Sequence, residues 1–280
     1  MPSFDTPEPI SITAHIGAGS LRITASDRLD TVVEVRPGDP KRDKDVRAAE
    51  QTEVTYASGV LTVRTKERRL IGPSGAVDVA VDLPTGSRVD VTGSWINMLG
   101  EGRLGEARVK TSVGDVRLDT TGPLQLTVSH GSITVDRVEG TAGITTSSGS
   151  LRVGTVDGPA VLKNSHGATA VAAVTGDLQV SGAHGDIDIA RAESSVTATT
   201  AYGALRVSEV ASGTVQLETS SGAIEVGVRE GTATWLDASS ERGQVRNALA
   251  DSEPPEETEG TVEVRARTRW GNIDVRRAKV

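Results

Sequence analysis

A short phrase repeated from Val109 to about Gly231 constrains the fold of this chain more than any other feature. The phrase is a small or polar residue, a glycine, any residue, an aliphatic residue, any residue and a second aliphatic residue. One copy is HGDIDI at 184–189, and another is SGAIEV at 221–226. The glycines recur roughly every 18 residues, with a second small turn residue about halfway between them. The chain therefore contains an internal repeat made of two halves.

This repeat predicts a parallel β-solenoid. Each half carries an alternating run long enough for one short strand, and the flanking glycines suit turns that need a positive φ. One repeat alone buries almost nothing, whereas stacked repeats pair their backbones and build a continuous apolar core. One predicted inward column contains Val116, Ile133, Leu151, Thr169, Ile187, Leu205 and Ile224. A column from the second strand contains Leu126, Ile144, Leu162, Val180, Ala198, Leu217 and Trp235.

A series of antiparallel hairpins is the competing arrangement. It requires neighbouring half-repeats to pair, whereas the solenoid places residues about 18 apart on top of one another. The fold class expected is all-β: a single-chain parallel β-solenoid with an irregular β-rich section at its N-terminal end.

The section from 1 to 108 is expected to be continuous with the solenoid, which then occupies 109–280. The charged stretch that follows Pro37 is either a short helix starting near Asp39 and ending near Glu50, or a solvated loop. The stretch 94–106 is expected to be a loop, and its Trp95 is expected to pack over a strand.

The C-terminal part is expected to contain an acidic loop insertion at 250–260, because like charges and prolines disfavour regular structure there. The phrase returns at 270–275, so 261–277 is predicted to be the final coil. Arg276, Arg277 and Lys279 would then protect its open edge from end-to-end growth.

Composition excludes several classes of function. The net charge of -8 argues against general nucleic-acid binding. The chain has no cysteine, hence no disulfide or thiolate metal site. Its beginning has neither the basic nor the apolar region of a signal peptide, and no apolar run reaches the ~20 residues of a membrane span. We therefore expect a cytoplasmic protein without membrane insertion.

The residues before the phrase glycines are expected to stack in one column: His130, Ser148, His166, His184, Tyr202 and Ser221. His166 and His184 would lie one repeat apart, with Asp186 and Asp188 nearby in sequence. Two imidazoles at that spacing could share a metal or titrate together, and paired carboxylates occur in carbohydrate-cleaving enzymes. The alternative is that these polar residues simply face water. We expect no catalytic, metal or cofactor site and treat the four residues as a candidate surface patch.

The repeated phrase, together with DLPTGS at 82–87 and VKTSVGDVRL at 109–118, resembles the bacterial putative-adhesin family of β-strand repeats. The resemblance covers the chain from about residue 75 onward. It implies a β-solenoid without assigned catalytic residues, and a link to cell-envelope stress in some relatives.

These observations predict a non-catalytic, adhesin-like scaffold or protein-interaction module. Its rigid outer face, with the stretches 37–51, 94–106 and 250–260, would contact a protein partner. Two alternatives stay open: self-assembly into a β-helical polymer, and a carbohydrate-binding or carbohydrate-cleaving β-helix that uses the candidate patch.

Overall fold

The computed structural model describes residues 2–65, 75–249 and 260–278. The chain divides into two compact units, unit 1 (Met1–Glu139) and unit 2 (Gly140–Val280). The predicted boundary at 108/109 stays a prediction. The predicted loop at 250–260 lies outside the described residues except for Gly260, and so does Lys279. The one helix among the described residues is short, and none there is long and apolar enough to cross a membrane.

Unit 1 combines parallel coils with an antiparallel layer. Its elements are β1 (Ser3–Asp5), β2 (Ser11–Ser26), β3 (Asp30–Pro37), α1 (Asp43–Glu50), β4 (Glu53–Ala57), β5 (Val60–Arg64), β6 (Val77–Pro84), β7 (Arg88–Arg103), β8 (Ala107–Val113), β9 (Val116–Thr121), β10 (Leu124–His130) and β11 (Ile133–Val138). The helix predicted to end near Glu50 is present. Its N-cap is Arg42, and Asp39 instead accepts a hydrogen bond from the backbone N–H of Lys41.

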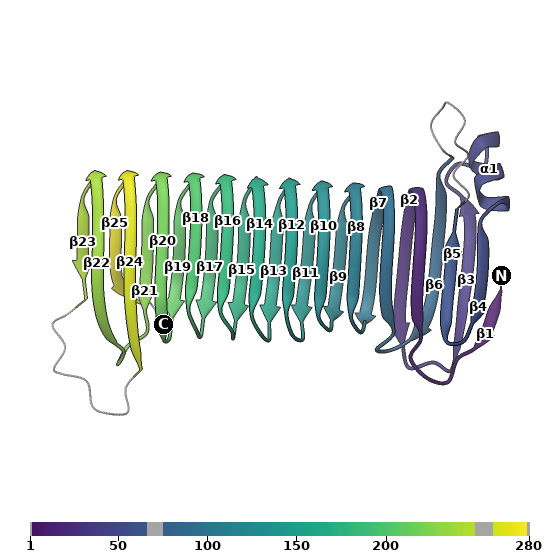
Figure 1. Ribbon diagram of the computed structural model, residues 1–280, viewed down its shortest axis with the longest axis horizontal. Helices are drawn as coiled ribbons and strands as arrows, with labels where there is room; N and C mark the ends of the chain where they lie inside the picture. Colours follow the sequence, from purple (N-terminus) through teal and green to yellow (C-terminus); the bar gives the residue numbers. More distant parts are fainter. Residues whose placement is uncertain (1, 66–74, 250–259, 279–280) are drawn as a thin grey trace. The chain divides into compact units, whose positions relative to one another are not determined.

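The strand β2 lies between segments that are consecutive in sequence. Its first half pairs in parallel with β5 on one side and β7 on the other, and its second half pairs with β6 and β7 in the same way (Figure 1). On the outer side of this coil, β3 pairs antiparallel with β6, β4 with β5, and β1 with β3. The helix α1 packs against β3 and β6.

Unit 2 consists of parallel coils of two strands each. Its elements are β12 (Ala142–Ser148), β13 (Leu151–Val156), β14 (Ala160–His166), β15 (Thr169–Val174), β16 (Leu178–His184), β17 (Ile187–Ala192), β18 (Val196–Tyr202), β19 (Leu205–Val210), β20 (Gly213–Ser221), β21 (Ile224–Val228), β22 (Ala233–Arg242), β23 (Val245–Ala248), β24 (Thr261–Trp270) and β25 (Ile273–Arg277).

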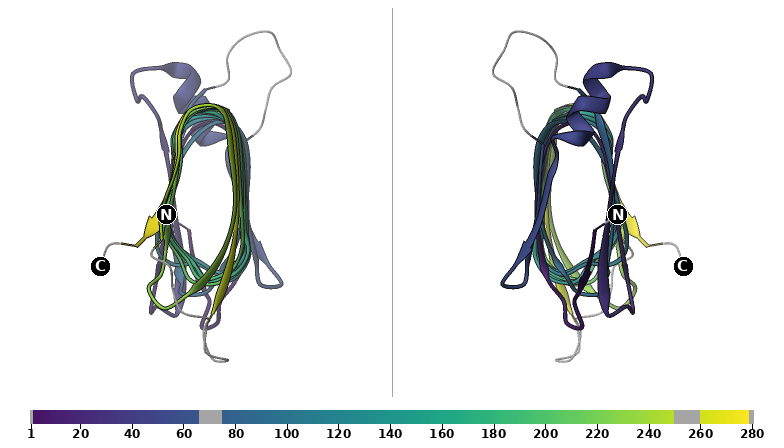
Figure 2. Two further views of the ribbon diagram at one scale, coloured as in Figure 1. Left: turned by 90° about the vertical axis from the view of Figure 1, so that its left-hand side faces the viewer. Right: turned by 90° about the vertical axis from the view of Figure 1, so that its right-hand side faces the viewer.

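The register of unit 2 confirms the solenoid and excludes the hairpin alternative. Ile187 pairs with Thr169 on one side and with Leu205 on the other, each 18 residues away, in parallel strands. Even-numbered strands form one wall of the coil and odd-numbered strands the other, and the two walls face each other across the core (Figure 2). Aliphatic residues fill that core, as the alternating pattern predicted.

The last coils of unit 2 do not follow the sequence order. The pair β24–β25 lies between β20–β21 and β22–β23 (Figure 1), so 261–277 is not the outermost coil. The prediction that 261–277 forms the end of the solenoid, with Arg276 and Arg277 protecting its edge, was therefore wrong. Among the described residues of unit 2, the outermost strands are β22 and β23.

Two further expectations were wrong in detail. The stretch 94–106 is not a loop: most of it belongs to the strand β7, which buries Ile96 and leaves Trp95 64% exposed. Trp235 does not point inward, because β22 pairs Leu236 with the buried Val264 and thereby turns Trp235 outward. In both cases the aliphatic neighbour takes the core position and the indole lies outside.

Candidate functional site

The glycines of the phrase fix one corner of each coil in unit 2. Gly185 has a φ of +139°, and a Cβ placed on it would lie 2.2 Å from the carbonyl oxygen of Gly167 in the adjacent coil. A side chain there would therefore face both backbone strain and a steric clash. Because the corner is so tight, the residue just before the glycine is held at the outer surface.

The parallel register aligns the residues that precede these glycines into one column, which we call the ring ladder. In spatial order its members are Ser148, His166, His184, Tyr202, Ser221, Trp270 and Arg242. The ladder combines residues from β12 to β24, and it includes members of the inserted strand β24 and of the edge strand β22.

Planar side chains of the ring ladder stack on one another. The ring centroids of His166 and His184 are 5.0 Å apart with an interplanar angle of 6°, and those of His184 and Tyr202 are 5.0 Å apart at 15°. At the other end, the guanidinium carbon of Arg242 lies 4.4 Å from the centroid of the Trp270 ring. This distance is within the range of a cation–π interaction.

Hydrogen bonds between adjacent coils hold the backbone of the ring ladder. The N–H of Gly185 donates to the carbonyl of Tyr202 at 2.8 Å. In the next coil, the N–H of Gly203 donates to the carbonyl of Ser221 at 2.9 Å. The spacing of the ladder is therefore set by the main chain and does not depend on which side chain occupies each position.

The structure separates the predicted patch into two groups. His166 and His184 stack in the ring ladder, whereas Asp186 and Asp188 are engaged by Arg206, whose Nη1 lies 3.4 Å and 3.1 Å from their respective carboxylates. These contacts with Asp188 and Asp186 raise the pKa of the Arg206 guanidinium. Asp186 also accepts a hydrogen bond from the N–H of Ala204 at 2.8 Å. That the four residues form one functional surface patch stays a prediction.

The stacked geometry does not favour a metal shared by the two histidines. Imidazole lone pairs lie in the ring plane, and nearly parallel planes do not direct them to a common point. Within residues 2–65, 75–249 and 260–278, no group of three or more His, Cys, Asp or Glu side chains could hold a metal ion. The ring ladder therefore offers stacking surfaces and hydrogen bonds rather than a coordination cage.

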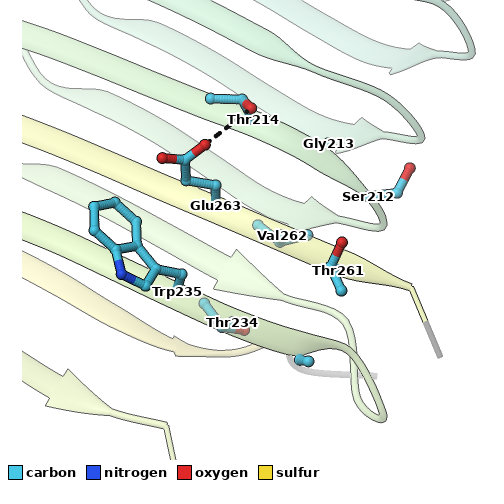
Figure 3. Close-up of a pocket in the computed structure, with 9 residues that line it drawn as sticks. Ser212, Gly213, Thr214, Thr234, Trp235, Thr261, Val262 and Glu263 are labelled. Carbon is cyan, nitrogen blue, oxygen red and sulfur yellow. Dashed lines mark hydrogen bonds between the residues drawn. The ribbon is translucent and has the colours of Figure 1, made fainter. Parts of the chain in front are cut away.

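A second exposed ring lines a shallow hollow near the beginning of β22. Trp235 stands beside Glu263 and Thr214, which come from β24 and β20 (Figure 3), in a hollow of about 690 Å³. The hydroxyl of Thr214 donates to Oε2 of Glu263 at 3.4 Å, and the guanidinium carbon of Arg265 lies 6.0 Å from the Trp235 ring. The hollow thus combines an aromatic surface with charged groups.

Aromatic side chains are distributed over this protein in an unusual way. The chain has three Trp, two Tyr and one Phe, and none of them is among the buried core residues. All three tryptophans are more than half exposed, and so is Tyr202. The core is aliphatic, the tryptophans and Tyr202 are at the surface, and Phe4 and Tyr56 are partly buried.

Sequence reasoning found the members of the ring ladder from Ser148 to Ser221 but not Trp270 and Arg242. Both also directly precede a glycine, Gly271 and Gly243, so the phrase itself carried the signal. Their place in the column was hidden because the spacing had loosened and because β24 is inserted between β20 and β22.

A family model described as Toastrack DUF4097 matches residues 8–276 of the chain. Several solved structures are similar to it. One, named a putative adhesin from Parabacteroides distasonis, is 17% identical, covers 94% of this chain and 95% of its own, and gives a TM-score of 0.46. Another putative adhesin, from Parabacteroides merdae, is 16% identical, covers 80% of this chain and 93% of its own, and gives a TM-score of 0.43. A third putative adhesin, from Bacteroides fragilis, is 14% identical, covers 98% of this chain and 95% of its own, and gives a TM-score of 0.39. No curated protein matches the chain.

Proposed function

The chain belongs to the Toastrack DUF4097 family, and on that premise we propose that it is a non-catalytic, adhesin-like scaffold whose exposed rings in unit 2 bind a protein partner. One observation carries the proposal: all the tryptophans lie outside a core that has no aromatic residue. Trp, Tyr and Arg are the residues that most often dominate the binding energy of protein interfaces.

Exposure of these rings has an energetic cost that interface formation would recover. A Trp side chain can bury roughly 150–250 Å², and burial contributes about 25 cal/mol per Å². Trp235 and Trp270 are 56% and 54% exposed, so for each of them roughly 2–3.5 kcal/mol of burial free energy is not realised. A single exposed ring would need no explanation. Two exposed indoles and a tyrosine on one set of coils, with arginines beside both indoles, support a binding surface.

The carboxylates of the same region support a scaffold more than an enzyme. Glu193 is hydrogen-bonded to Arg229, with Nη2 2.9 Å from its Oε1, and this contact lowers the pKa of the carboxyl group. Glu209 lies 2.6 Å from Nε of the same Arg229. These acids are engaged in ion pairs that connect neighbouring coils, an arrangement that serves register rather than proton transfer.

Site-specific crosslinking in native extract would test the proposal. A photoreactive phenylalanine analogue at position 270 or 235 should capture the same protein partner from separate reactions. Val161 is the matched control, since it is an apolar residue that is 41% exposed on the outer face of β14 and lies outside the ring ladder. Equal capture from position 161, or none from 235 and 270, would count against the proposal.

Self-association is a second candidate, and the exposed edge of unit 2 favours it. Every residue of β23 is exposed, and among the described residues β23 pairs only with β25. An unprotected edge can pair with another chain. Sedimentation over a concentration series should then show a dimer or larger species that Val245→Lys removes. A constant monomer mass would exclude this candidate.

We also propose a cytoplasmic location and a role under cell-envelope stress, as the family resemblance and the sequence suggested. Fractionation should then recover the protein with soluble cytoplasmic markers, and its abundance should rise when envelope synthesis is inhibited. Recovery in the envelope fraction, or unchanged abundance, would contradict the respective proposal.

A further inference from the structure

We propose that the ring ladder contains a slot at Ser221 that accepts one aromatic side chain of the protein partner. The slot deepens the proposed function and rests on it. Ser221 is the small member of the column that lies between two large rings, since it pairs with Tyr202 on one side and with Trp270 on the other. A serine side chain is too short to fill the space that a ring would occupy at this position.

Each of the two flanking rings has one face covered within the ladder. His184 stacks on one face of Tyr202, and Arg242 covers one face of Trp270. By strand order, the other face of each ring is on the Ser221 side. The two uncovered faces are therefore on opposite sides of the same rung.

The spacing matches one inserted aromatic ring. Adjacent strands lie about 4.8 Å apart, so the rungs of Tyr202 and Trp270 are separated by roughly 9.6 Å. A ring halfway between them would lie about 4.8 Å from each, within the range of roughly 4.5–7 Å for stacked aromatic pairs. The ladder already uses this geometry, because His184 and Tyr202 stack at 5.0 Å. An inserted ring would thus continue a stack that the protein has built on both sides.

The main chain is regular through the slot. The carbonyl of Ser221 accepts a hydrogen bond from Gly203, and the carbonyl of Trp270 accepts one from Gly222, both at 2.9 Å. The gap in the ladder therefore arises from the size of one side chain and not from an irregular backbone. Insertion of a ring would require no rearrangement of the strands.

The exposure of the slot indicates that the ring belongs to a larger partner. Tyr202 and Trp270 are both more than half exposed, so a free small aromatic molecule would leave much of its surface in water. Small-molecule sites normally enclose most of the ligand. Charged residues of the same two strands, Glu218 of β20 and Arg267 of β24, are also exposed and directly paired in register. They provide the polar, solvent-accessible rim that surrounds the buried centre of a typical protein interface.

Nuclear magnetic resonance on the full chain with labelled Tyr and Trp would test the slot. The probe is N-acetyl-tryptophanamide, with N-acetyl-leucinamide and methyl glucoside as comparison probes. We expect the tryptophan amide to shift the ring signals of Tyr202 and Trp270 together, at millimolar concentration, and to leave Trp235 and Trp95 unchanged. Equal shifts from the leucine amide, or stronger shifts from the sugar, would overturn the assignment to an aromatic side chain.

Two substitutions in the same column separate the slot from a general aromatic effect. Ser221→Phe should occupy the slot with its own ring, reproduce the shifts of Tyr202 and Trp270 without any probe, and lower the response to the probe at least tenfold. Ser148→Phe adds a ring beside His166 instead, away from the slot, and should leave the response unchanged. A normal response in Ser221→Phe would overturn the proposal, provided that its circular dichroism matches the parent protein.

The outcome distinguishes this inference from the function on which it rests. If crosslinking from position 270 succeeds but the ring signals do not respond to the tryptophan amide, the ring ladder binds its partner without the slot. If Ser221→Phe abolishes partner capture from position 270 while Ser148→Phe does not, both the interface and the slot are supported.

Discussion

Each unit contains a segment inserted between strands that are otherwise consecutive in sequence, but the two units cover the neighbouring edge differently. In unit 1 the strand β2 is inserted between β5–β6 and β7, and in unit 2 the pair β24–β25 is inserted between β20–β21 and β22–β23. In each case a segment near a chain terminus gains strand partners on both sides. The backbone of each inserted segment is therefore paired on both sides.

The coil outside the inserted segment shows the difference. In unit 1 the short antiparallel strands β1, β3 and β4 cover that coil, and Leu61, Val63 and Val81 are fully buried. In unit 2 the outer coil is itself the edge among the described residues: Leu236 is only partly buried, and Val245 is 43% exposed. In unit 1 additional strands thus cover an edge, whereas the corresponding edge of unit 2 is accessible.

The accessible edge of unit 2 is where binding is to be expected. Long exposed edges invite pairing with other chains, and natural proteins usually block them with short strands or charges. Unit 1 follows that rule. The exposed coil of unit 2 instead carries Trp235 and Arg242, the residues that connect it to the hollow and to the ring ladder.

The largest effect on the free energy of unfolding is expected when an aliphatic side chain is truncated in β2 of unit 1, compared with one in β22 of unit 2. Ile23→Ala in β2 should lower the free energy of unfolding by about 2–5 kcal/mol, because the side chain is fully buried between two coils. Leu236→Ala in β22 removes a partly exposed side chain and should cost about 1 kcal/mol. Urea denaturation followed by circular dichroism measures both. Equal losses would mean that the outer coil of unit 2 is as well packed as the inserted strand of unit 1.

Hydrogen exchange should reveal the same contrast within unit 2. The amides of β23 should exchange at least about 100-fold faster than those of β25, although β25 is closer to the end of the chain. The reason is that β25 pairs with both β21 and β23, whereas β23 is paired on one side only among the described residues. Mass spectrometry of peptides from both strands provides the measurement. Slower exchange in β23 would show that something covers this edge in solution.

The strands and register of the regular coils could be predicted from the sequence, because their period appears directly in the positions of the aliphatic residues and glycines. The sequence did not determine the order of the end coils. The phrase Ile273-Asp274-Val275 can stack on Ile224-Glu225-Val226 as well as any other copy can, so the repeat alone carries no information on which coil is outermost.

A physical signal for the order was nevertheless present. The coil of β23 carries Asn247 where Val275 lies in β25 and Val226 in β21, and the structure exposes Asn247 while it buries the two valines. The more apolar coil occupies the inner position because both of its sides are then removed from water. The ring ladder followed the same pattern: its histidines were predictable from the period, and Trp270 was not, since its neighbours depend on the insertion.

The edge strand β22 of unit 2 should be less protected from hydrogen exchange at acidic pH. Asp237 of β22 is hydrogen-bonded to Arg267 of β24, and this contact lowers the pKa of its carboxyl group. The ion pair therefore stabilises β22 at pH values above the ordinary carboxyl pKa of about 3.9, and the contribution is lost as pH falls through the lower pKa of the folded state. Exchange protection of β22, corrected for the intrinsic pH dependence, should decrease between pH 6 and pH 3.

Asp237→Asn is the control for this acid response. It should show reduced protection of β22 already at pH 6 and a smaller further change at pH 3. If the variant kept the full acid response of the parent protein, other carboxylates would have to hold the edge. Glu241 of β22 is the first to examine, because its Oε1 lies 3.9 Å from Nε of Arg269 in β24.

The smallest effects are expected for the exposed rings themselves. Trp95 in unit 1 is 64% exposed, and Trp95→Ala should change the free energy of unfolding by no more than about 0.5 kcal/mol. Trp270→Ala in unit 2 also removes the contact with Arg242 and should cost about 0.5–1 kcal/mol more. A double-mutant cycle with Arg242→Ala isolates this coupling between β24 and the edge strand β22. A coupling energy near zero would show that the Arg242 contact does not hold the edge. A value above about 2 kcal/mol would make Trp270 a structural residue, and its exposed face would then no longer argue for a partner.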